Sequence, residues 1–176
     1  MLRPSGGDNR RVPTIRRLQA ADWPVLRAAR LRALEDAPYA FGSTVAEEEQ
    51  NPDAWWLASA EHLAWFVSEE DGDVVGLVAG FPSGEIECPE IISMWVDAGH
   101  RGSGVAEQLL SEVLDWARGT GAEEVSLGVA DGNGRALCFY ERAGFRLTGE
   151  SEPLRSRPKV CTYEMRLPLQ GRSGRS

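Results

Sequence analysis

Residues 91–106, which read IISMWVDAGHRGSGVA, hold the information that decides the fold. They combine an apolar strand, a turn and a glycine-containing loop, and a helical apolar stripe follows at Ala106, Leu109, Leu110, Val113, Leu114 and Ala117. Such a loop presents unblocked backbone N–H groups at the positive end of a helix dipole, a geometry that binds phosphate. We therefore expect a phosphate site here, to which Arg101 adds a charge-assisted contact.

Two well-known phosphate loops do not fit these residues. The loop of nucleoside triphosphatases ends in Gly-Lys-Ser or Gly-Lys-Thr, and the single lysine of this chain is Lys159. The dinucleotide pattern G-x-G-x-x-G would need glycine at position 107, which is Glu107. The remaining pattern is Arg-x-x-Gly-x-Ala over residues 101–106.

A second informative block covers residues 133–145, NGRALCFYERAGF. Asn133 is a good helix N-cap, and Ala136, Phe139 and Tyr140 follow with helical spacing. Gly144 is a suitable C-terminal stop. Taken alone, Tyr140 reads as a packed core tyrosine.

The two blocks together resemble the GNAT (GCN5-related N-acetyltransferase) superfamily. The first block is similar to its acyl-CoA pyrophosphate loop, Q/R-x-x-G-x-G/A, and the second to its N-x-x-A-x-x-F-Y-x-x-x-G-F segment. The resemblance extends over roughly residues 12–168. It implies acetyl-CoA as cosubstrate and an α/β fold, in which a mixed central sheet with splayed parallel strands is flanked by helices.

The rest of the chain fits one such domain over residues 12–170, with flexible tails at 1–11 and 171–176. Asp22 and Asp53 are expected to cap helices, and Asp71-Gly72 is a hairpin turn signal. A loop is expected around Pro153 and Pro158. We expect strands at 14–18, 64–68, 74–81, 90–96, 125–129, 145–148 and 160–167, and helices from 23, from 53, over 105–118 and from 133.

The resemblance places the cofactor's pantetheine arm in a gap between strands 90–96 and 125–129. The backbone of Met94 and Val96 would pair with its amides, and the Trp95 side chain would point to the opposite face. A bulge near Met94–Val96 is compatible with this arrangement. The implied cofactor-binding residues are Met94, Trp95, Val96, Arg101, Gly102, Ser103, Gly104, Val105, Ala106, Asn133 and Tyr140.

The implied reaction moves acetyl from acetyl-CoA to a primary amine by direct attack in a ternary complex. Tyr140 would act as general acid toward the leaving thiolate, and the Val96 N–H would stabilise charge on the thioester oxygen. Glu90 is the candidate base, with Glu87 and a water relay as alternatives. An exposed charge at a strand end is an equally good interpretation of either glutamate.

Phe41, Glu47 and Trp55 lie in the part of the chain where such enzymes build the acceptor pocket. Core packing for the tryptophan and a solvated face for the glutamates are the competing interpretations. We expect a small-molecule amine as acceptor. The alternatives are a protein N-terminus or lysine side chain, and a non-catalytic acyl-CoA sensor.

The composition of the chain further limits the classes of protein to which it can belong. The 176 residues are 42% hydrophobic and 26% charged, without a membrane-length apolar run, as in an ordinary globular domain. A net charge of −8 argues against nucleic-acid binding. It fits a cationic substrate such as an amine, and it fits equally well an acidity that only keeps the protein in solution. Three scattered cysteines and two isolated histidines predict reduced thiols, a cytoplasmic location and no metal site. The arginine-rich, lysine-poor composition suggests a bacterial source, and a homodimer is among the assemblies to expect of this superfamily.

Overall fold

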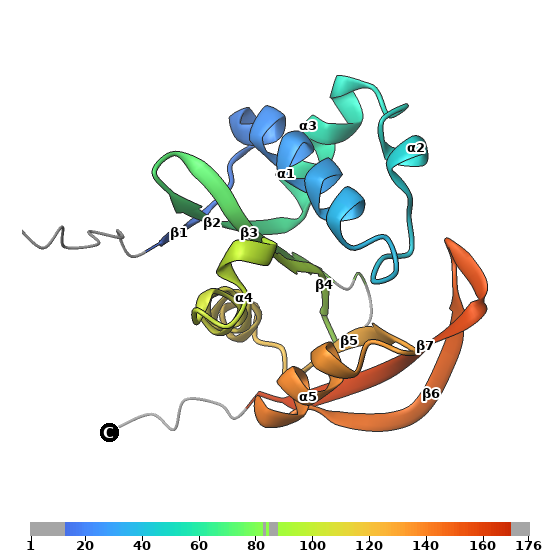
Figure 1. Ribbon diagram of the computed structural model, residues 1–176. Helices are drawn as coiled ribbons and strands as arrows, with labels where there is room; N and C mark the ends of the chain where they lie inside the picture. Colours follow the sequence, from blue (N-terminus) through green and yellow to red (C-terminus); the bar gives the residue numbers. More distant parts are fainter. Residues whose placement is uncertain (1–12, 83, 85–87, 170–176) are drawn as a thin grey trace, which may run out of the picture.

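The computed structural model describes residues 13–82, 84 and 88–169. The expected tails at 1–11 and 171–176, and the alternative base Glu87, lie outside these residues. Seven strands form one sheet in the order β1-β2-β3-β4-β5-β7-β6, with helices on both faces (Figure 1). The expected α/β architecture with a mixed sheet is confirmed.

The elements follow one another largely as the sequence predicts. Short 3₁₀ turns at Ala20–Asp22 and Ala98–His100 precede α1 and α4. The helices are α1 (Trp23–Asp36), α2 (Val45–Glu48), α3 (Asp53–His62), α4 (Val105–Gly119) and α5 (Gly134–Arg142). The strands are β1 (Thr14–Arg17), β2 (Ala64–Glu70), β3 (Asp73–Phe81), β4 (Glu90–Val96), β5 (Glu124–Ala130), β6 (Arg146–Leu154) and β7 (Arg157–Pro168). None of the helices in the described part of the chain is long and apolar enough to cross a membrane.

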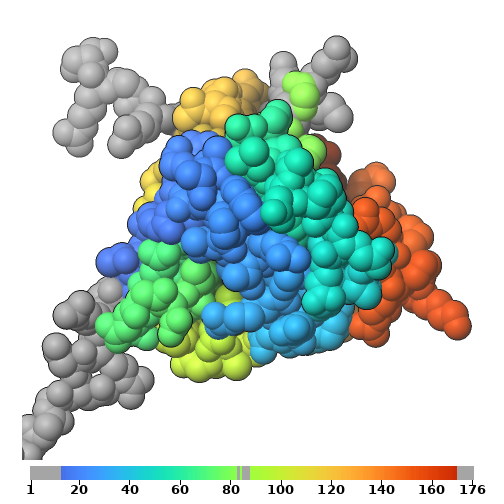
Figure 2. All heavy atoms as spheres, turned by 90° about the horizontal axis from the view of Figure 1, so that it is seen from above, coloured from blue at the N-terminus to red at the C-terminus, as the bar shows by residue number. Residues whose placement is uncertain are grey.

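Helices α1 and α3 cover strands β2–β4 on one face of the sheet, here called the front. Helix α1 buries Leu26, Ala29, Ala33 and Leu34, and they pack with Trp56 of α3. Asp22 occupies the N-cap of α1 as expected, but it makes no side-chain cap bond there, because its carboxylate accepts the Gln19 N–H at 2.8 Å in the preceding turn. Asp53 does not cap α3: it is the first residue of that helix, and Pro52 occupies the N-cap. Figure 2 looks onto this face.

The opposite face, here called the back, carries α4 and α5. The buried stripe of α4 is Val105, Leu109, Leu110, Val113, Leu114 and Ala117. Our assignment of Ala106 to this stripe was wrong: it is only partly buried and lines a cavity instead, because the first turn of α4 stands at the edge of the sheet opening. Helix α5 contributes Tyr140, which packs edge-on against Phe145.

Strand β4 is where the sheet opens. It pairs in parallel with β5 only at Glu90–Ser126 and Ile91–Leu127, and beyond these residues the two strands separate. On its other side β4 stays paired with β3, through a bulge in which Ser93 has φ of +60°. The expected gap between residues 90–96 and 125–129 is therefore confirmed, and the bulge lies at its start.

The last two strands are longer than the sequence suggests. Strand β6 ends at Leu154 and β7 begins at Arg157. The expected loop around Pro153 and Pro158 is therefore a tight hairpin instead. Pro153 lies on the edge strand β6, and Pro158 lies in the part of β7 beyond its pairing with β5, so both prolines stand where a strand has one free edge and can be tolerated. The hairpin projects beside the front helices (Figure 2, orange to red).

Candidate active site

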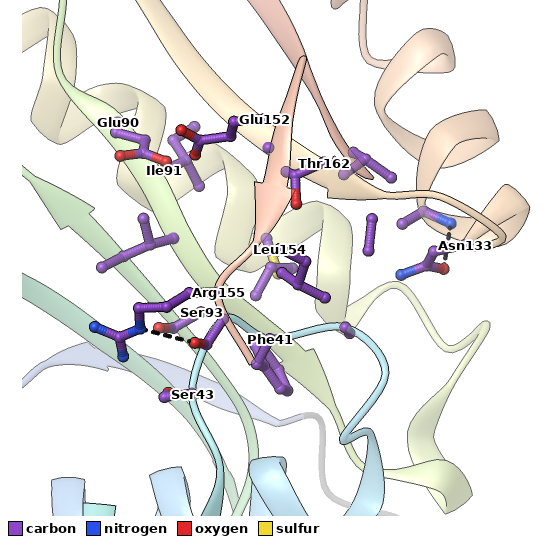
Figure 3. Close-up of a pocket in the computed structure, with 18 of the residues that line it drawn as sticks. Phe41, Ser43, Glu90, Ile91, Ser93, Asn133, Glu152, Leu154, Arg155 and Thr162 are labelled. Carbon is purple, nitrogen blue, oxygen red and sulfur yellow. Dashed lines mark hydrogen bonds between the residues drawn. The ribbon is translucent and has the colours of Figure 1, made fainter. Parts of the chain in front are cut away.

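Two cavities meet in the gap between β4 and β5. The larger has a volume of about 500 Å³ and opens toward the front helices and the β6–β7 hairpin (Figure 3). The smaller, about 220 Å³, extends to the glycine loop and the first turn of α4. Their shared walls are Ala40, Phe41, Met94, Asn133, Ala136 and Tyr140. A molecule that reaches from one cavity to the other therefore passes through the gap.

The glycine loop has the backbone geometry expected of an anion site. Gly102 and Gly104 have φ of +81° and +93°, values that side chains other than glycine rarely adopt. Gly104 is the N-cap of α4, so the first N–H groups of a 15-residue helix lack helical acceptors beside the loop. The Ser103 hydroxyl donates to the His100 carbonyl at 2.6 Å, which stabilises the turn before the helix.

The end of β4 offers an unpaired strand edge to the smaller cavity. The Asp97 N–H donates to the Val75 carbonyl at 2.9 Å. Because bonding directions alternate along an antiparallel strand, the Val96 N–H and carbonyl point away from β3 and into the gap. The Met94 and Val96 side chains pack toward the back core, whereas Trp95 is buried in the front core, as expected.

Arg101 is placed differently from a free phosphate ligand. Its Nε donates to the Val96 carbonyl at 3.0 Å, and its Nη2 forms an ion pair with the Asp36 carboxylate at the end of α1. The same carboxylate accepts the Trp95 indole N–H at 2.9 Å. The guanidinium is therefore held against β4 and α1.

Tyr140 and Asn133 lie where the two cavities join. The Tyr140 side chain is 6% exposed, and burial raises the pKa of its hydroxyl above the ordinary value of 10. The hydroxyl therefore stays protonated at neutral pH and can donate. The Asn133 side-chain oxygen accepts the Ala136 N–H at 3.3 Å, which confirms the expected N-cap, while the residue also lines both cavities.

Glu90 lines the larger cavity at the paired end of β4 (Figure 3). Although its carboxylate is accessible, the surrounding protein raises its pKa by partial burial, and the charges of Glu152 and Glu164 raise it further. A third cavity of about 300 Å³ adjoins this end and adds Glu150. Glu164 is partly neutralised by Arg166 at 3.1 Å. This end of the site is consequently acidic.

The expected acceptor residues are only partly brought together. Phe41 lines both cavities. Glu47 instead accepts the Thr44 N–H at 2.8 Å in a capping box of α2. Trp55 is 44% exposed and packs edge-on against Trp56, and neither it nor Glu47 lines a described cavity.

The cavity wall also contains residues that sequence reasoning missed. Buried Arg30 pairs with Glu48 at 2.9 Å, donates to Ser43, and lies over the Phe41 ring. At the hairpin tip, the Arg155 Nε donates to the Gly42 carbonyl at 3.0 Å and roofs the larger cavity. No sequence signal announces these contacts, because the partners are distant in the chain.

Acidic, histidine and cysteine side chains are the groups that most often hold metal ions in proteins. Among residues 13–82, 84 and 88–169, no group of three or more is placed to hold a metal ion.

Comparison with known families gives one match over most of the chain. The family model described as "Acetyltransferase (GNAT) family" matches residues 23–145. Among curated proteins, N-acetyltransferase family 8 member 2 of Rattus norvegicus is 34% identical over 93 residues, which cover 50% of this chain and 41% of that protein. The chain thus aligns with about two fifths of the length of this relative.

Two solved structures share the fold, one over nearly the whole chain and the other over about three fifths of it. The Salmonella typhimurium protein yncA, determined with its cofactor acetyl-CoA, has a TM-score of 0.72 at 22% identity and covers 94% of this chain and 99% of its own. Nourseothricin acetyltransferase has a TM-score of 0.57 at 28% identity and covers 61% of this chain and 66% of its own.

Proposed function

This chain belongs to the acetyltransferase (GNAT) family, and we propose that it transfers the acetyl group of acetyl-CoA to a primary amine of a small molecule. The observation that carries the proposal is the gap between β4 and β5. The gap has at one end a glycine loop with the backbone geometry of an anion site, in the middle a buried tyrosine hydroxyl, and at the other end a cavity that could hold a second molecule.

The residues present fit acetyl-CoA. The glycine loop and the first N–H groups of α4 would hold the pyrophosphate. The strand edge at Val96 would pair with the pantetheine amides, as when an extended peptide adds to a sheet. When bound, acetyl-CoA supplies an activated acetyl thioester at the junction of the two cavities.

Three groups of this chain would serve the transfer. Glu90, directly or through water, accepts a proton from the incoming ammonium, so that the amine nitrogen can attack the acetyl carbon. The Val96 N–H donates to the acetyl oxygen as negative charge develops there. As the carbon–sulfur bond breaks, the Tyr140 hydroxyl gives a proton to the sulfur of coenzyme A, and the second proton that the attacking nitrogen loses returns to the Tyr140 oxygen through water.

The walls of the larger cavity support a small cationic acceptor. The hairpin tip and residues 41–43 enclose it on one side, and Arg30 is already neutralised by Glu48. Glu90 and Glu152 remain at its other side and, among the described residues of the wall, outnumber the one further cation, Arg155 of the hairpin tip. Opposite charge at the mouth of a site raises the local concentration of a cationic amine.

A peptide amine is the second candidate acceptor. The third cavity continues the acidic wall along β5, β6 and β7 through Glu150 and Glu164, and a basic peptide segment could follow it. A sensor that binds acetyl-CoA without turnover is a third candidate. The three functions differ in which amines release thiol, and they can therefore be separated in one assay.

The test is coenzyme A release from acetyl-CoA with a panel of polyamines, amino acids, aminoglycosides and short peptides. Tyr140→Phe should lower the turnover number about 100-fold if the hydroxyl is the general acid. Tyr163→Phe is the matched control, because Tyr163 is 40% exposed and lies on β7 outside the cavities.

Release with one class of small amine, lost in Tyr140→Phe and kept in Tyr163→Phe, supports the proposal. Release only with peptides favours the second candidate. Acetyl-CoA binding without release by any amine in the panel contradicts the proposal and favours a sensor.

A further inference from the structure

The position of Arg101 beside the glycine loop suggests that it binds phosphate, but its guanidinium makes two other interactions. Its Nε donates to the Val96 carbonyl at 3.0 Å, and its Nη2 pairs with Asp36. The Arg101 and Asp36 side chains are 28% and 31% exposed, so solvent screens the pair only in part. A guanidinium neutralised by a carboxylate attracts phosphate less than a free one does.

Asp36 also connects three elements of the fold. It is the last residue of α1, and it accepts the Trp95 indole N–H at 2.9 Å as well as the Arg101 Nη2. Trp95 and Val96 are consecutive in β4, one pointing to the front core and the other presenting its backbone to the gap. The Asp36 carboxylate therefore fixes two side chains next to Val96. One is that of Trp95, which precedes Val96 in β4, and the other is that of Arg101, which donates to the Val96 carbonyl.

We propose that Asp36 and Arg101 are positioning residues that hold the Val96 strand edge in register for the pantetheine arm, and that Arg101 is not a ligand of the phosphates. This inference rests on the proposed function only in taking acetyl-CoA as the cosubstrate. A carbonyl oxygen has two lone pairs, so Val96 can accept from Arg101 and from a pantetheine amide together. The planar fork of arginine suits this double role, whereas a lysine ammonium cannot span both partners in the same way.

The test compares two ligands by calorimetry, acetyl-CoA and 3′-phosphoadenosine 5′-diphosphate, which is coenzyme A without its pantetheine arm. The variants are Arg101→Ala, Arg101→Lys, Asp36→Asn and the double variant Asp36→Asn/Arg101→Ala. Asp115→Asn is the matched control, since Asp115 forms a 2.7 Å pair with Arg118 on the exposed side of α4. Circular dichroism and thermal unfolding confirm that each variant is folded.

We expect each single variant to weaken acetyl-CoA binding about tenfold, as the loss of one well-placed hydrogen bond allows. The double variant should be no weaker than the singles, because the two residues act as one unit. Binding of 3′-phosphoadenosine 5′-diphosphate should stay within about twofold of wild type throughout, because no charge that contacts phosphate is removed. Once an acceptor amine is known, the turnover number of the variants should also be lower than that of the wild type, because the Val96 N–H is displaced.

The opposite pattern would overturn the inference. If Arg101 binds phosphate, Arg101→Ala weakens both ligands equally, Arg101→Lys restores affinity, and Asp36→Asn tightens binding by freeing the guanidinium. A wild-type protein that binds neither ligand overturns the proposed function, and this inference with it. If the wild type binds both ligands and the variants behave as expected for an Arg101 that binds phosphate, this inference alone is overturned.

Discussion

The two ends of β4 have the same strand geometry but different neighbours. At Glu90 and Ile91 the strand is paired with β3 on one side and β5 on the other. At Val96 it is paired with β3 alone, and its second edge faces the gap. In a sheet interior an unpaired edge is a cost, because buried N–H and carbonyl groups need partners. The proposed function accounts for the open edge here, because acetyl-CoA would complete the sheet.

Proline substitution tests this comparison with the largest expected effect. Val96→Pro removes an N–H that points into the gap, so acetyl transfer should fall by about 10²–10³-fold, the value for one lost oxyanion donor. Ile91→Pro removes an N–H from a strand paired on both sides and should prevent stable folding. Urea denaturation and thiol release measure the two effects separately. Equal losses of stability would show that the Val96 N–H bonds to β3.

Close packing at the paired end gives the second prediction. A Cβ at Gly80, opposite Ile91, would lie 2.1 Å from the Trp116 ring of α4. Gly80→Ala should therefore lower the free energy of unfolding by about 2 kcal/mol, a typical overpacking penalty. Gly119→Ala, at the end of α4 with nothing within 4 Å of the added atom, serves as control and should be nearly neutral. A stable Gly80→Ala variant would mean that Trp116 can move aside.

The acidic wall beside the paired end predicts a change in pH dependence. Burial raises the pKa of Glu90 and the charge of Glu152 raises it further, so Glu152→Gln should lower that pKa. If Glu90 is the base, the acid limb of kcat/KM against pH should move to lower pH in Glu152→Gln and disappear in Glu90→Gln. Glu112→Gln, on the exposed side of α4, should leave the profile in place. A limb that survives in Glu90→Gln would assign the base elsewhere.

The smallest effect concerns the turn that follows the open end. His100 contacts Glu70 at 2.6 Å and Asp97 at 3.4 Å, and hydrogen bonding to Glu70 raises its pKa above 6.5. A raised folded pKa contributes stability that is fully present below the unfolded pKa and is lost as pH rises through the folded pKa. His100→Gln should therefore cost at most about 1 kcal/mol, and only in acid. Unfolding curves at pH 5.5 and pH 9 would measure it, and an equal cost at both would exclude an ionic origin.

Local patterns predicted the parts of the molecule that local forces shape. The glycine loop, the α4 stripe and the Asn133 cap follow from backbone conformation and helical spacing within a few residues. The gap between β4 and β5 was correctly placed as well, but its prediction came from the family resemblance and not from periodicity.

Contacts between distant segments were not predictable in this way. Arg101 meets Asp36 across 65 residues, and Arg30 meets Glu48 across 18. The ends of β6 and β7 were missed because prolines 153 and 158 are loop signals in the sequence, whereas in the fold each lies where its strand has one free edge. Glu47 and Trp55 have suitable chemistry, but their helices orient them away from the cavities.

The roof of the larger cavity has a consequence for how the chain folds and opens. Arg155 and Ser156 donate to the carbonyls of Gly42 and Phe41, and these bonds join segments 113 and 115 residues apart. Contacts that close such long loops form late, after the sheet has brought the segments together. Two hydrogen bonds to backbone carbonyls stabilise the closed form by about 1–3 kcal/mol, far less than global unfolding requires. The hairpin tip should therefore exchange its amide protons well before the core does.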